Sequence, residues 1–263
     1  MNLNLTDKTA IVGGSSQGLG EASAIALAAQ GASIVLIARN QNKLEQVISR
    51  LNTQKGQQHS FVVADHSQPY ELKQKVEQHL TKKNITAEIL INNTGGPPPG
   101  PISSMSSTQI LTAINMHLIA SHELAMILLP NMKSKKYGRI INITSTSIKE
   151  PIKDLGLSNT VRASVANWAK TMANELATFG ITVNNVLPGT IATTRIDQIL
   201  EARANKNNSN IETELNLMKN AIPMKRIGEV QDIGSAVAFL ASLAANYITG
   251  INLPVDGGRT KGL

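Results

Sequence analysis

The sequence predicts an α/β fold: one doubly wound, parallel sheet of seven strands with helices on both faces. Two observations lead to this prediction: short β-branched runs alternate with longer amphipathic stretches along the 263 residues, and aromatic residues make up only 3%. Charged residues make up only 16%, which excludes a wholly disordered chain. Repeated strand–helix units are typical of a parallel sheet, and an aliphatic core suits buried strands covered by alanine-rich helices. We expect residues 1–263 to form a single domain.

Each expected strand is a short apolar run bounded by Gly, Asn, Asp or Pro, and each expected helix is amphipathic. The strands are expected at Ala10–Val12, Ser33–Ala38, Phe61–Ala64, Ile89–Ile91, Ile140–Ile143, Val183–Leu187 and Ile251–Val255. The helices are expected at Glu21–Gln30, Lys43–Gln54, Pro69–Leu80, Thr108–Met132, Arg162–Thr178 and Val230–Ala241.

One segment departs from this alternation. Residues 193–223 are polar and asparagine-rich and contain no strand pattern. The segment is either a surface insertion or a mobile lid over a site at the strand ends, and its position favours the lid.

Composition excludes several classes of function. Lys and Arg number 25 against 18 Asp and Glu, a formal charge of +7, and there is no cysteine. Without cysteine there is no disulfide, thiolate metal site or Cys nucleophile, and no metal site is predicted. The basic residues are dispersed and aromatics are scarce, which argues against nucleic acid. No apolar run approaches the roughly 18 residues that span a bilayer, so we expect a cytoplasmic protein without a membrane partner.

A glycine-rich turn follows the first strand and precedes the first helix. Gly14 permits the tight turn, Gly18 lets the backbone approach a pyrophosphate, and Gly20 lets the helix pack closely on the strand. The phosphates would then meet the free N–H groups and positive dipole end of the helix. The glycine spacing is G-x-x-x-G-x-G.

This spacing resembles the short-chain dehydrogenase/reductase family, and further motifs extend the resemblance over essentially the whole chain. They are the N-N-T-G run at 92–95, the helix asparagine Asn115, Ser145 after the fifth strand, the P-G-x-x-x-T turn at 188–193, and the ending at 247–258. The chain is most similar to the 3-oxoacyl-carrier-protein reductase group. The resemblance implies a Rossmann-type fold and a cofactor site formed by Gly14, Ser16, Gln17, Gly18, Leu19, Gly20, Arg39, Asn40, Asp65, His66, Asn93, Thr94, Gly95, Arg162, Pro188, Gly189, Ile191 and Thr193.

The residues after the second strand favour NADP(H) over NAD(H). A carboxylate there would accept hydrogen bonds from a free ribose and repel a 2′-phosphate, whereas this chain has Arg39, followed by Asn40. Arginine offers a planar set of donors to phosphate, with no acid expected nearby; it could also be an ordinary exposed turn residue. Relatives that use NADP often carry a second basic residue in the glycine turn, where this chain has Gln17.

The family's tyrosine proton donor and its lysine, four residues later, fall at Ser158 and Arg162 when counted from Ser145. Serine is a far weaker acid than a phenol and reaches less far. Arginine can hold a ribose and supply charge but cannot usefully shuttle protons, because its pKa exceeds about 12. Losing one positioned proton donor typically costs about 10²–10⁴ in rate. The resemblance therefore implies a modified active site formed by Asn115, Ser145, Ser158 and Arg162.

No other acid is evident in the sequence. Tyr137 precedes the fifth strand, at the end of the sheet away from the site, and Tyr70 and Tyr247 lie outside the motifs. His117 is expected on another helix face than Asn115. Four charged residues between Ser145 and Ser158 could reach the site, although a solvated loop is the favoured interpretation. They are Lys149, Glu150, Lys153 and Asp154.

Three functions remain open at this point. The first is an NADP(H)-dependent oxidoreductase that reduces a 3-oxoacyl-like or other ketone to an alcohol, with water delivering the proton. The second is a catalytically impaired NADP(H)-binding sensor or partner subunit. The third is non-redox chemistry like that of halohydrin dehalogenases, which keep the tyrosine and lose the glycine turn, the reverse of this chain.

The long helices 108–132 and 158–178 resemble those of family homotetramers, and a homotetramer acting on a small-molecule carbonyl or alcohol is expected.

Overall fold

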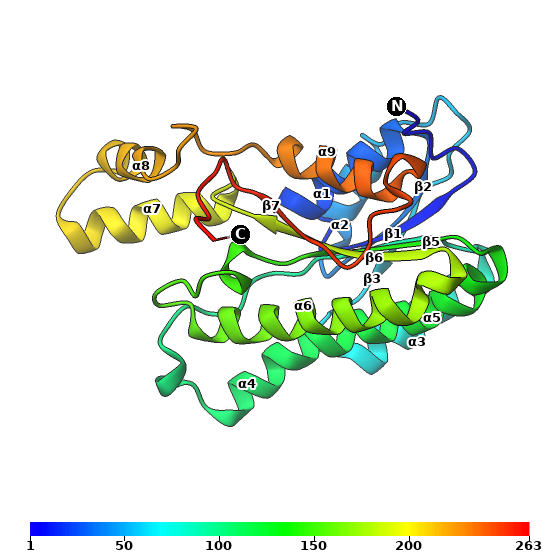
Figure 1. Ribbon diagram of the computed structural model, residues 1–263, viewed down its shortest axis with the longest axis horizontal. Coiled ribbons are helices and arrows are strands. Elements are labelled where there is room, and N and C mark those ends of the chain that lie inside the picture. The colour runs from blue at the N-terminus through cyan, green and yellow to red at the C-terminus, as the bar shows by residue number, and fades with distance from the viewer. Residues whose placement is uncertain (263) are drawn as a thin grey trace.

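The computed structural model describes residues 1–262. Its centre is a seven-stranded parallel sheet in the order β3-β2-β1-β4-β5-β6-β7 (Figure 1), which confirms the predicted fold class. The strands are β1 (Thr9–Gly13), β2 (Ser33–Ala38), β3 (Ser60–Val63), β4 (Ile89–Asn92), β5 (Gly138–Ile143), β6 (Ile181–Pro188) and β7 (Asn252–Val255). The strand order reverses between β1 and β4, and ligands of such sheets bind at the carboxyl ends of the strands beside that switch point.

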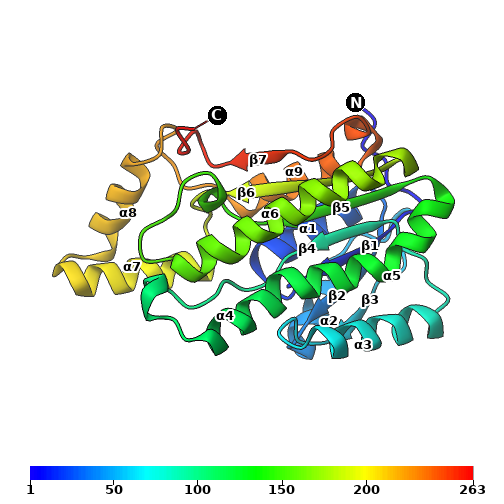
Figure 2. The same ribbon diagram turned by 60° about the horizontal axis from the view of Figure 1, so that its bottom comes forward.

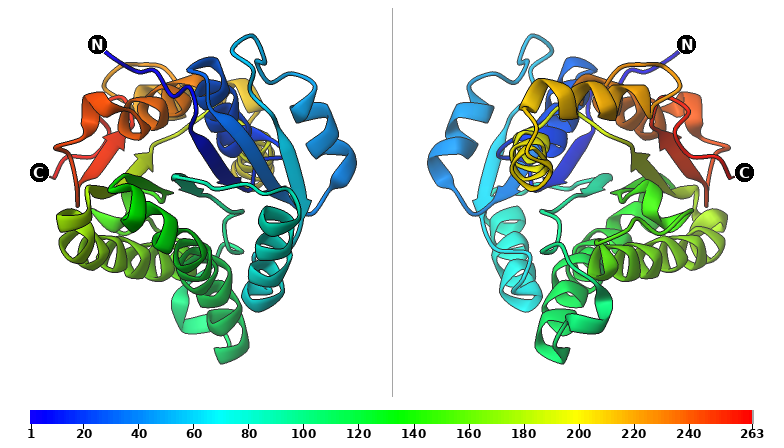
Figure 3. Two further views of the ribbon diagram at one scale, coloured as in Figure 1. Left: turned by 90° about the vertical axis from the view of Figure 1, so that its right-hand side faces the viewer. Right: turned by 90° about the vertical axis from the view of Figure 1, so that its left-hand side faces the viewer.

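Helices cover both faces of the sheet, as Figure 3 shows from its two ends. One layer contains α1 (Gly18–Ala29), α2 (Gln41–Ile48) and α9 (Val230–Ala241). The other contains α3 (Pro69–Lys82), α4 (Ser107–Ile114), α5 (Ala120–Lys135) and α6 (Gly156–Leu176). The prediction placed α6 six residues too late, since it begins before Ser158 and not at Arg162, and α2 ends six residues earlier than expected.

The aliphatic composition fills two cores, one on each side of the sheet. Along β2, Ile34 and Leu36 belong to one buried cluster while Val35 and Ile37 belong to the other. This alternation follows from the two-residue period of a strand, and it explains why the strands read as continuous apolar runs.

The run 107–135 is one helical rod interrupted by a π-helical turn at Asn115–Ile119. By length and hydropathy alone it could cross a membrane, a test that the core helix of a soluble protein also passes. Its apolar residues Leu124, Leu128 and Met132 are buried in the core against the sheet. This helical run is therefore a core helix that packs against one face of the sheet.

The segment at residues 193–223 forms two helices, α7 (Thr194–Asn207) and α8 (Ile211–Asn220), which project beyond the carboxyl ends of the strands (Figure 1). Several polar side chains of this segment cap or connect the two helices. The Asn210 side chain accepts a hydrogen bond from the Thr213 N–H, and Asn207 and Ser209 both donate to the buried Glu214 carboxylate. The predicted position over the strand ends is confirmed, and the predicted mobility stays a prediction.

Four asparagines form a ladder across β4, β5, β6 and β7. Asn92 donates to Asn142 at 2.8 Å, Asn142 to Asn185 at 2.9 Å, and Asn185 to Asn252 at 2.7 Å. Each pair occupies directly opposite positions in the sheet. Asn92 is the last residue of β4 and Asn142 the last but one of β5, so this end of the ladder lies next to the predicted site residues Asn93 and Ser145.

Candidate active site

A groove of about 1420 Å³ follows the carboxyl ends of the strands. All predicted site residues line it except Gly20 and Asn115. Those that do are Gly14, Ser16, Gln17, Gly18, Leu19, Arg39, Asn40, Asp65, His66, Asn93, Thr94, Gly95, Ser145, Ser158, Arg162, Pro188, Gly189, Ile191 and Thr193. Residues far apart in the sequence therefore meet at one edge of the sheet.

The glycine turn has the geometry of a dinucleotide cradle. Gly14 and Gly18 have φ of +54° and +62°, where side chains are disfavoured. A Cβ on Gly20 would lie 2.3 Å from the Gly14 carbonyl oxygen, so this glycine serves helix packing and does not face the groove. A Cβ on Gly18 would meet only Thr193 Cγ2, at 3.7 Å. No side chain caps the N-terminus of α1, which leaves its amides available to an anion.

The loop after β4 borders the same space. Asn93 Nδ2 donates to the carbonyl oxygens of Gly13 and Gly14, both at 3.2 Å, which fixes this loop against the glycine turn. Apart from Gly95 itself and its two chain neighbours, no described residue has an atom within 4 Å of a Cβ added at Gly95. The residues present thus fit an extended dinucleotide passing between the two loops.

The end of the groove beside β2 and β3, where the adenosine would lie, carries the two cations Arg39 and Lys43. Arg39 is exposed, and Lys43 Nζ donates to Gln17 Oε1 at 2.7 Å, so a lysine from α2 stands at the glycine turn. The expectation that no acid stands near Arg39 is wrong, because its guanidinium lies 3.7 Å from the Asp65 carboxylate. Both side chains are solvent-accessible, and such pairs contribute little. His66 is buried beside them, and burial lowers its pKa to about 4 against the opposing charge of Asp65.

At the other end, Arg162 contacts both Ser158 and the end of β5. Its Nη1 donates to the Ile143 and Thr144 carbonyl oxygens, each at 2.9 Å, and its Nε donates to Ser158 Oγ at 3.4 Å. Burial, and then the charge of Arg195, lowers the pKa of Arg162 to about 10, so it is cationic near neutral pH. Ser145 Oγ accepts the N–H of Ser147 at 3.1 Å.

The π turn places Asn115 and His117 beneath this end. The Asn115 carbonyl accepts from the Ala120 N–H, and the Asn115 side chain does not line the groove. His117 is buried, and burial followed by the nearby charge of Arg162 lowers its pKa to about 2. A neutral imidazole cannot act as a cationic acid near neutral pH.

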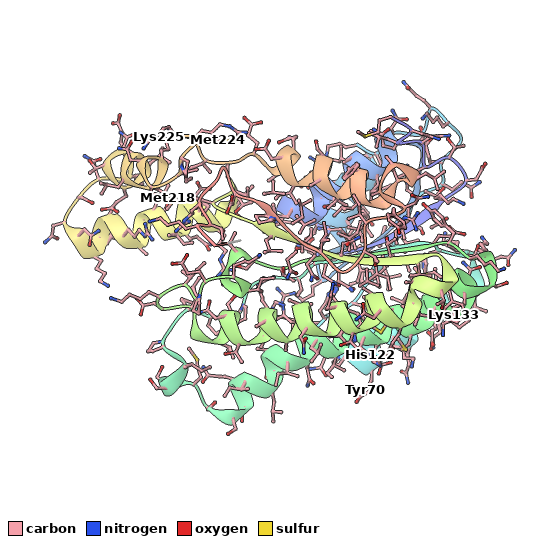
Figure 4. All side chains as sticks on the ribbon, in the orientation of Figure 1. Tyr70, His122, Lys133, Met218, Met224 and Lys225 are labelled. Atoms are coloured by element: carbon pink, nitrogen blue, oxygen red, sulfur yellow. The ribbon has the colours of Figure 1, made fainter. Side chains whose placement is uncertain are left out.

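None of the three tyrosines lines the groove. Tyr137 donates its hydroxyl to the Ala241 carbonyl oxygen, and Tyr70 and Tyr247 are exposed. Tyr70 lies in the first turn of α3, in the outer helix layer (Figure 4). The charged loop residues between Ser145 and Ser158 are exposed and do not line the groove.

The proline-rich run 96–101 acts as a connector. Only Gly96 lines the groove. Gly100 accepts from the Gly156 N–H at 3.0 Å and donates to the Asp154 carbonyl oxygen at 2.7 Å, which ties the run to the start of α6.

Several residues that line the groove were not predicted from the sequence. Lys43 and Arg50 join the adenosine end, and three arginines join the other end: Arg195 and Arg203 from α7, and Arg259 after β7. The asparagine-rich composition of the segment gave no hint that its arginines face the site, although Arg195 is only two residues from the predicted Thr193. Met218, buried between α8 and α7 (Figure 4), also lines the groove.

The sheet order, the glycine cradle and the hydroxyl-bearing end of the groove define a dinucleotide-dependent oxidoreductase of the Rossmann class. A family described as enoyl-(acyl carrier protein) reductase matches residues 14–260. The chain belongs to the short-chain dehydrogenase/reductase family.

Similar proteins span its whole length. It is 30% identical to the NADPH-dependent reductase BacG of Bacillus subtilis over 98% of this chain and 100% of that one. It is 34% identical to the 3-oxoacyl-[acyl-carrier-protein] reductase FabG of Haemophilus influenzae over 95% of this chain and 97% of that one. The crystal structure of L-sorbose reductase from Gluconobacter frateurii, complexed with NADPH and L-sorbose, superposes with a TM-score of 0.93 at 28% identity and covers 100% of both chains.

Proposed function

We propose that this protein is an NADP(H)-dependent oxidoreductase that reduces a small-molecule carbonyl to an alcohol in a modified active site. One observation carries the proposal: the groove presents two serine hydroxyls whose oxygens already accept hydrogen bonds from the protein. Ser145 accepts from the Ser147 N–H, and Ser158 accepts from Arg162. Each O–H is then left to donate towards a substrate carbonyl.

The chain's own residues would bind, orient and polarise. NADPH, when bound, supplies the hydride. The glycine turn would hold its pyrophosphate, and Arg162 would hold the nicotinamide ribose. Ser145 and Ser158 would donate to the carbonyl oxygen as negative charge develops on it, which is how an oxyanion site lowers a barrier. Ser158 is polarised for this by the cationic guanidinium of Arg162.

Proton delivery is assigned to water. Ser158 is too weak an acid to replace a phenol, and no tyrosine lines the groove. Asn115, at the π turn of the rod, would anchor a water chain leading to the Ser145–Ser158 pair. This step is the one that the replacement of a tyrosine and a lysine would slow most.

The cofactor is NADP(H), in preference to NAD(H). Arg39 and Lys43 line the same end of the groove and would contact a 2′-phosphate, with Lys43 as the second cation that Gln17 does not supply. BacG and L-sorbose reductase are named with NADPH. Asp65 lies close to Arg39 but is in reach of solvent and does not close the phosphate site.

The test is NADPH oxidation across a panel of ketones with four proteins. Ser145→Ala and Ser158→Ala should each lower kcat by about 10²–10³, the loss expected for one oxyanion donor, while the NADPH Kd stays constant. Tyr247→Phe, a fully exposed control, should leave kcat unchanged.

Two outcomes would contradict the proposal. Tight NADPH binding with no turnover of any carbonyl would indicate the impaired sensor or partner subunit instead. Weak turnover that Ser145→Ala leaves unchanged would also exclude these serines from the chemistry.

We also propose a homotetramer in which the outer faces of α5 and α6 meet those of partner copies. Figure 2 shows these helices side by side on one face of the molecule. Sedimentation equilibrium measures the oligomeric state directly, and a monomer would refute the proposal.

Two lysines near the end of α5 already have partners: Lys135 contacts the Glu88 carboxylate, and Lys133 lies 4.9 Å from the Phe179 ring centre. They offer little to a carrier protein, so a free small molecule is the proposed substrate.

A further inference from the structure

The charge that lines the groove is divided between its two ends. On the β1–β2–β3 side the charged lining residues are of both signs: Glu21, Arg39, Lys43, Arg50 and Asp65. Glu21 and Arg50 pair at 2.7 Å, and Asp65 faces Arg39. On the β5–β6–β7 side every charged lining residue is an arginine: Arg162, Arg195, Arg203 and Arg259. Within residues 1–262, none of these four lies within 4 Å of a carboxylate oxygen.

Two of the four arginines are held by neutral acceptors. Arg162 donates to backbone carbonyls at the end of β5, and Arg259 Nη1 donates to Thr190 Oγ1 at 2.7 Å. Arg195 and Arg203 belong to α7, the helix that projects over the strand ends. Both are exposed, and no hydrogen bond to another described side chain holds either guanidinium.

Arg195 reaches across the groove. A Cβ added at Gly96 would lie 1.7 Å from Arg195 Nη1 and 2.7 Å from its Cζ. The guanidinium therefore rests on the backbone of the loop that carries Thr94 and Gly95. This loop and Ser145 border the same space, so the charge stands beside the proposed reaction centre.

The positive charges of the arginines on the β5–β6–β7 side of the groove repel one another. The charge of Arg195 contributes to the lowered pKa of Arg162, and both arginines contribute to that of His117. With no lining carboxylate at this end, a ligand anion would relieve the repulsion. Guanidinium groups bind carboxylate and phosphate with paired, charge-assisted hydrogen bonds.

We infer that the substrate is an anionic ketone, bearing a carboxylate or phosphate group that Arg195 binds with support from Arg203. The inference rests on the proposed function, because it names the substrate class of the same site. The anion would seat under α7 while the carbonyl faces Ser145 and Ser158. Neutral ketones of the same shape would lack the main contact.

Matched substrate pairs test this. Reduction by NADPH is compared for 4-oxopentanoate and its methyl ester, and for dihydroxyacetone phosphate and dihydroxyacetone. In the unaltered protein, at least one anionic member should have a kcat/KM at least tenfold above its neutral partner. The carboxylate and phosphate pairs separate the two kinds of anion.

Variants of Arg195 then test whether its guanidinium binds the anionic group of the substrate. Arg195→Gln should raise KM for the anionic ketone about 10- to 100-fold, the worth of a charge-assisted hydrogen bond, and leave the neutral partner unchanged. Arg195→Lys should recover part of the loss. Lys206→Gln, which removes an exposed cation from the same helix outside the groove, should change neither value.

A binding measurement keeps this inference separate from the proposed function. The full-length protein loaded with NADPH is titrated with 4-oxopentanoate or inorganic phosphate, and the fluorescence of the bound cofactor is followed. Saturable binding that Arg195→Gln weakens tenfold supports the anion site even where no carbonyl is reduced. Equal kinetics for acid and ester, or no anion binding, overturns the inference. A tenfold rise in the NADPH Kd of Arg195→Gln overturns it as well, because the arginine would then belong to the cofactor.

Discussion

At the scale of single residues, the proposed 2′-phosphate site consists of two cations, Arg39 and Lys43, that sequence analysis alone does not bring together. Arg39 follows β2 directly, but Lys43 reaches the glycine turn only through its hydrogen bond to Gln17, 26 positions away in the chain. Local sequence identifies Arg39 because a strand end has a fixed role in this fold. It cannot identify Lys43, because that placement depends on how α2 packs.

The pair should act on one phosphate. Arg39→Ala and Lys43→Ala are each expected to raise the NADPH Kd about 5- to 50-fold, as for the loss of one charge-assisted contact, and to change the NADH Kd less than twofold. Fluorescence titration of both cofactors measures this. Lys75→Ala, in a surface pair with Glu71 on α3, is the control. Equal losses for NADH and NADPH would place these side chains away from the 2′-phosphate.

At the scale of elements, the start of α6 decides where Ser158 and Arg162 lie. The Gly156 N–H donates to the Gly100 carbonyl oxygen, and a Cβ on Gly156 would lie 2.5 Å from the Ile102 nitrogen. The proline-rich run is thus packed against the first turn of the helix. A glycine is needed here because backbone fills the space that a side chain would occupy.

Gly156→Ala should therefore destabilise the protein although alanine favours helices. The clash with backbone is expected to cost about 1–3 kcal/mol, the range for overpacking, and to lower kcat by shifting Ser158. Urea unfolding and NADPH oxidation measure the two effects. Ala163→Gly, at an exposed position of the same helix, should cost about 1 kcal/mol with kcat unchanged. A stabilised and fully active Gly156→Ala would show that the loop can move aside.

The elements also show which parts of the fold the sequence could predict. All seven strands were expected at their observed places, because β-branched runs between turn residues have few other interpretations. The helices α7 and α8 were not, since the polar, asparagine-rich sequence of the segment suggested a surface insertion or a lid and its helices were not recognised. Arg195 was missed for the same reason: its contact with Gly96 exists only once α7 is placed over the strand ends.

At the scale of the whole molecule, two buried histidines make stability depend on pH. The folded-state pKa is about 4 for His66 and about 2 for His117, against about 6.5 in an unfolded chain. Between these values the unfolded state binds more protons, so the free energy of unfolding decreases as the pH falls. The stability from neutral burial is complete above pH 6.5 and is lost on acidification towards the folded pKa.

Each histidine should lower the free energy of unfolding by about 1–2 kcal/mol as the pH falls from 7 to 5. Urea unfolding at pH 7, 6 and 5 should show this slope, and His66→Gln or His117→Gln should flatten it. Ser121→Ala removes a hydrogen bond to the His117 carbonyl, and it should lower stability equally at every pH. Identical slopes in all four proteins would mean that neither imidazole is held neutral by the fold.

The asparagine ladder has a consequence for how the sheet assembles. The central strands are aliphatic on both faces, so apolar packing alone distinguishes poorly between alternative strand alignments. The three amide–amide hydrogen bonds form in one alignment only, with Asn92, Asn142, Asn185 and Asn252 opposite one another. A slip of one residue would turn an amide to the other face and leave buried donors and acceptors unpaired, at about 1–3 kcal/mol each. The ladder consequently fixes the register of these four strands, and with it the positions of the loop residues Asn93 and Ser145 and of Pro188 at the end of β6.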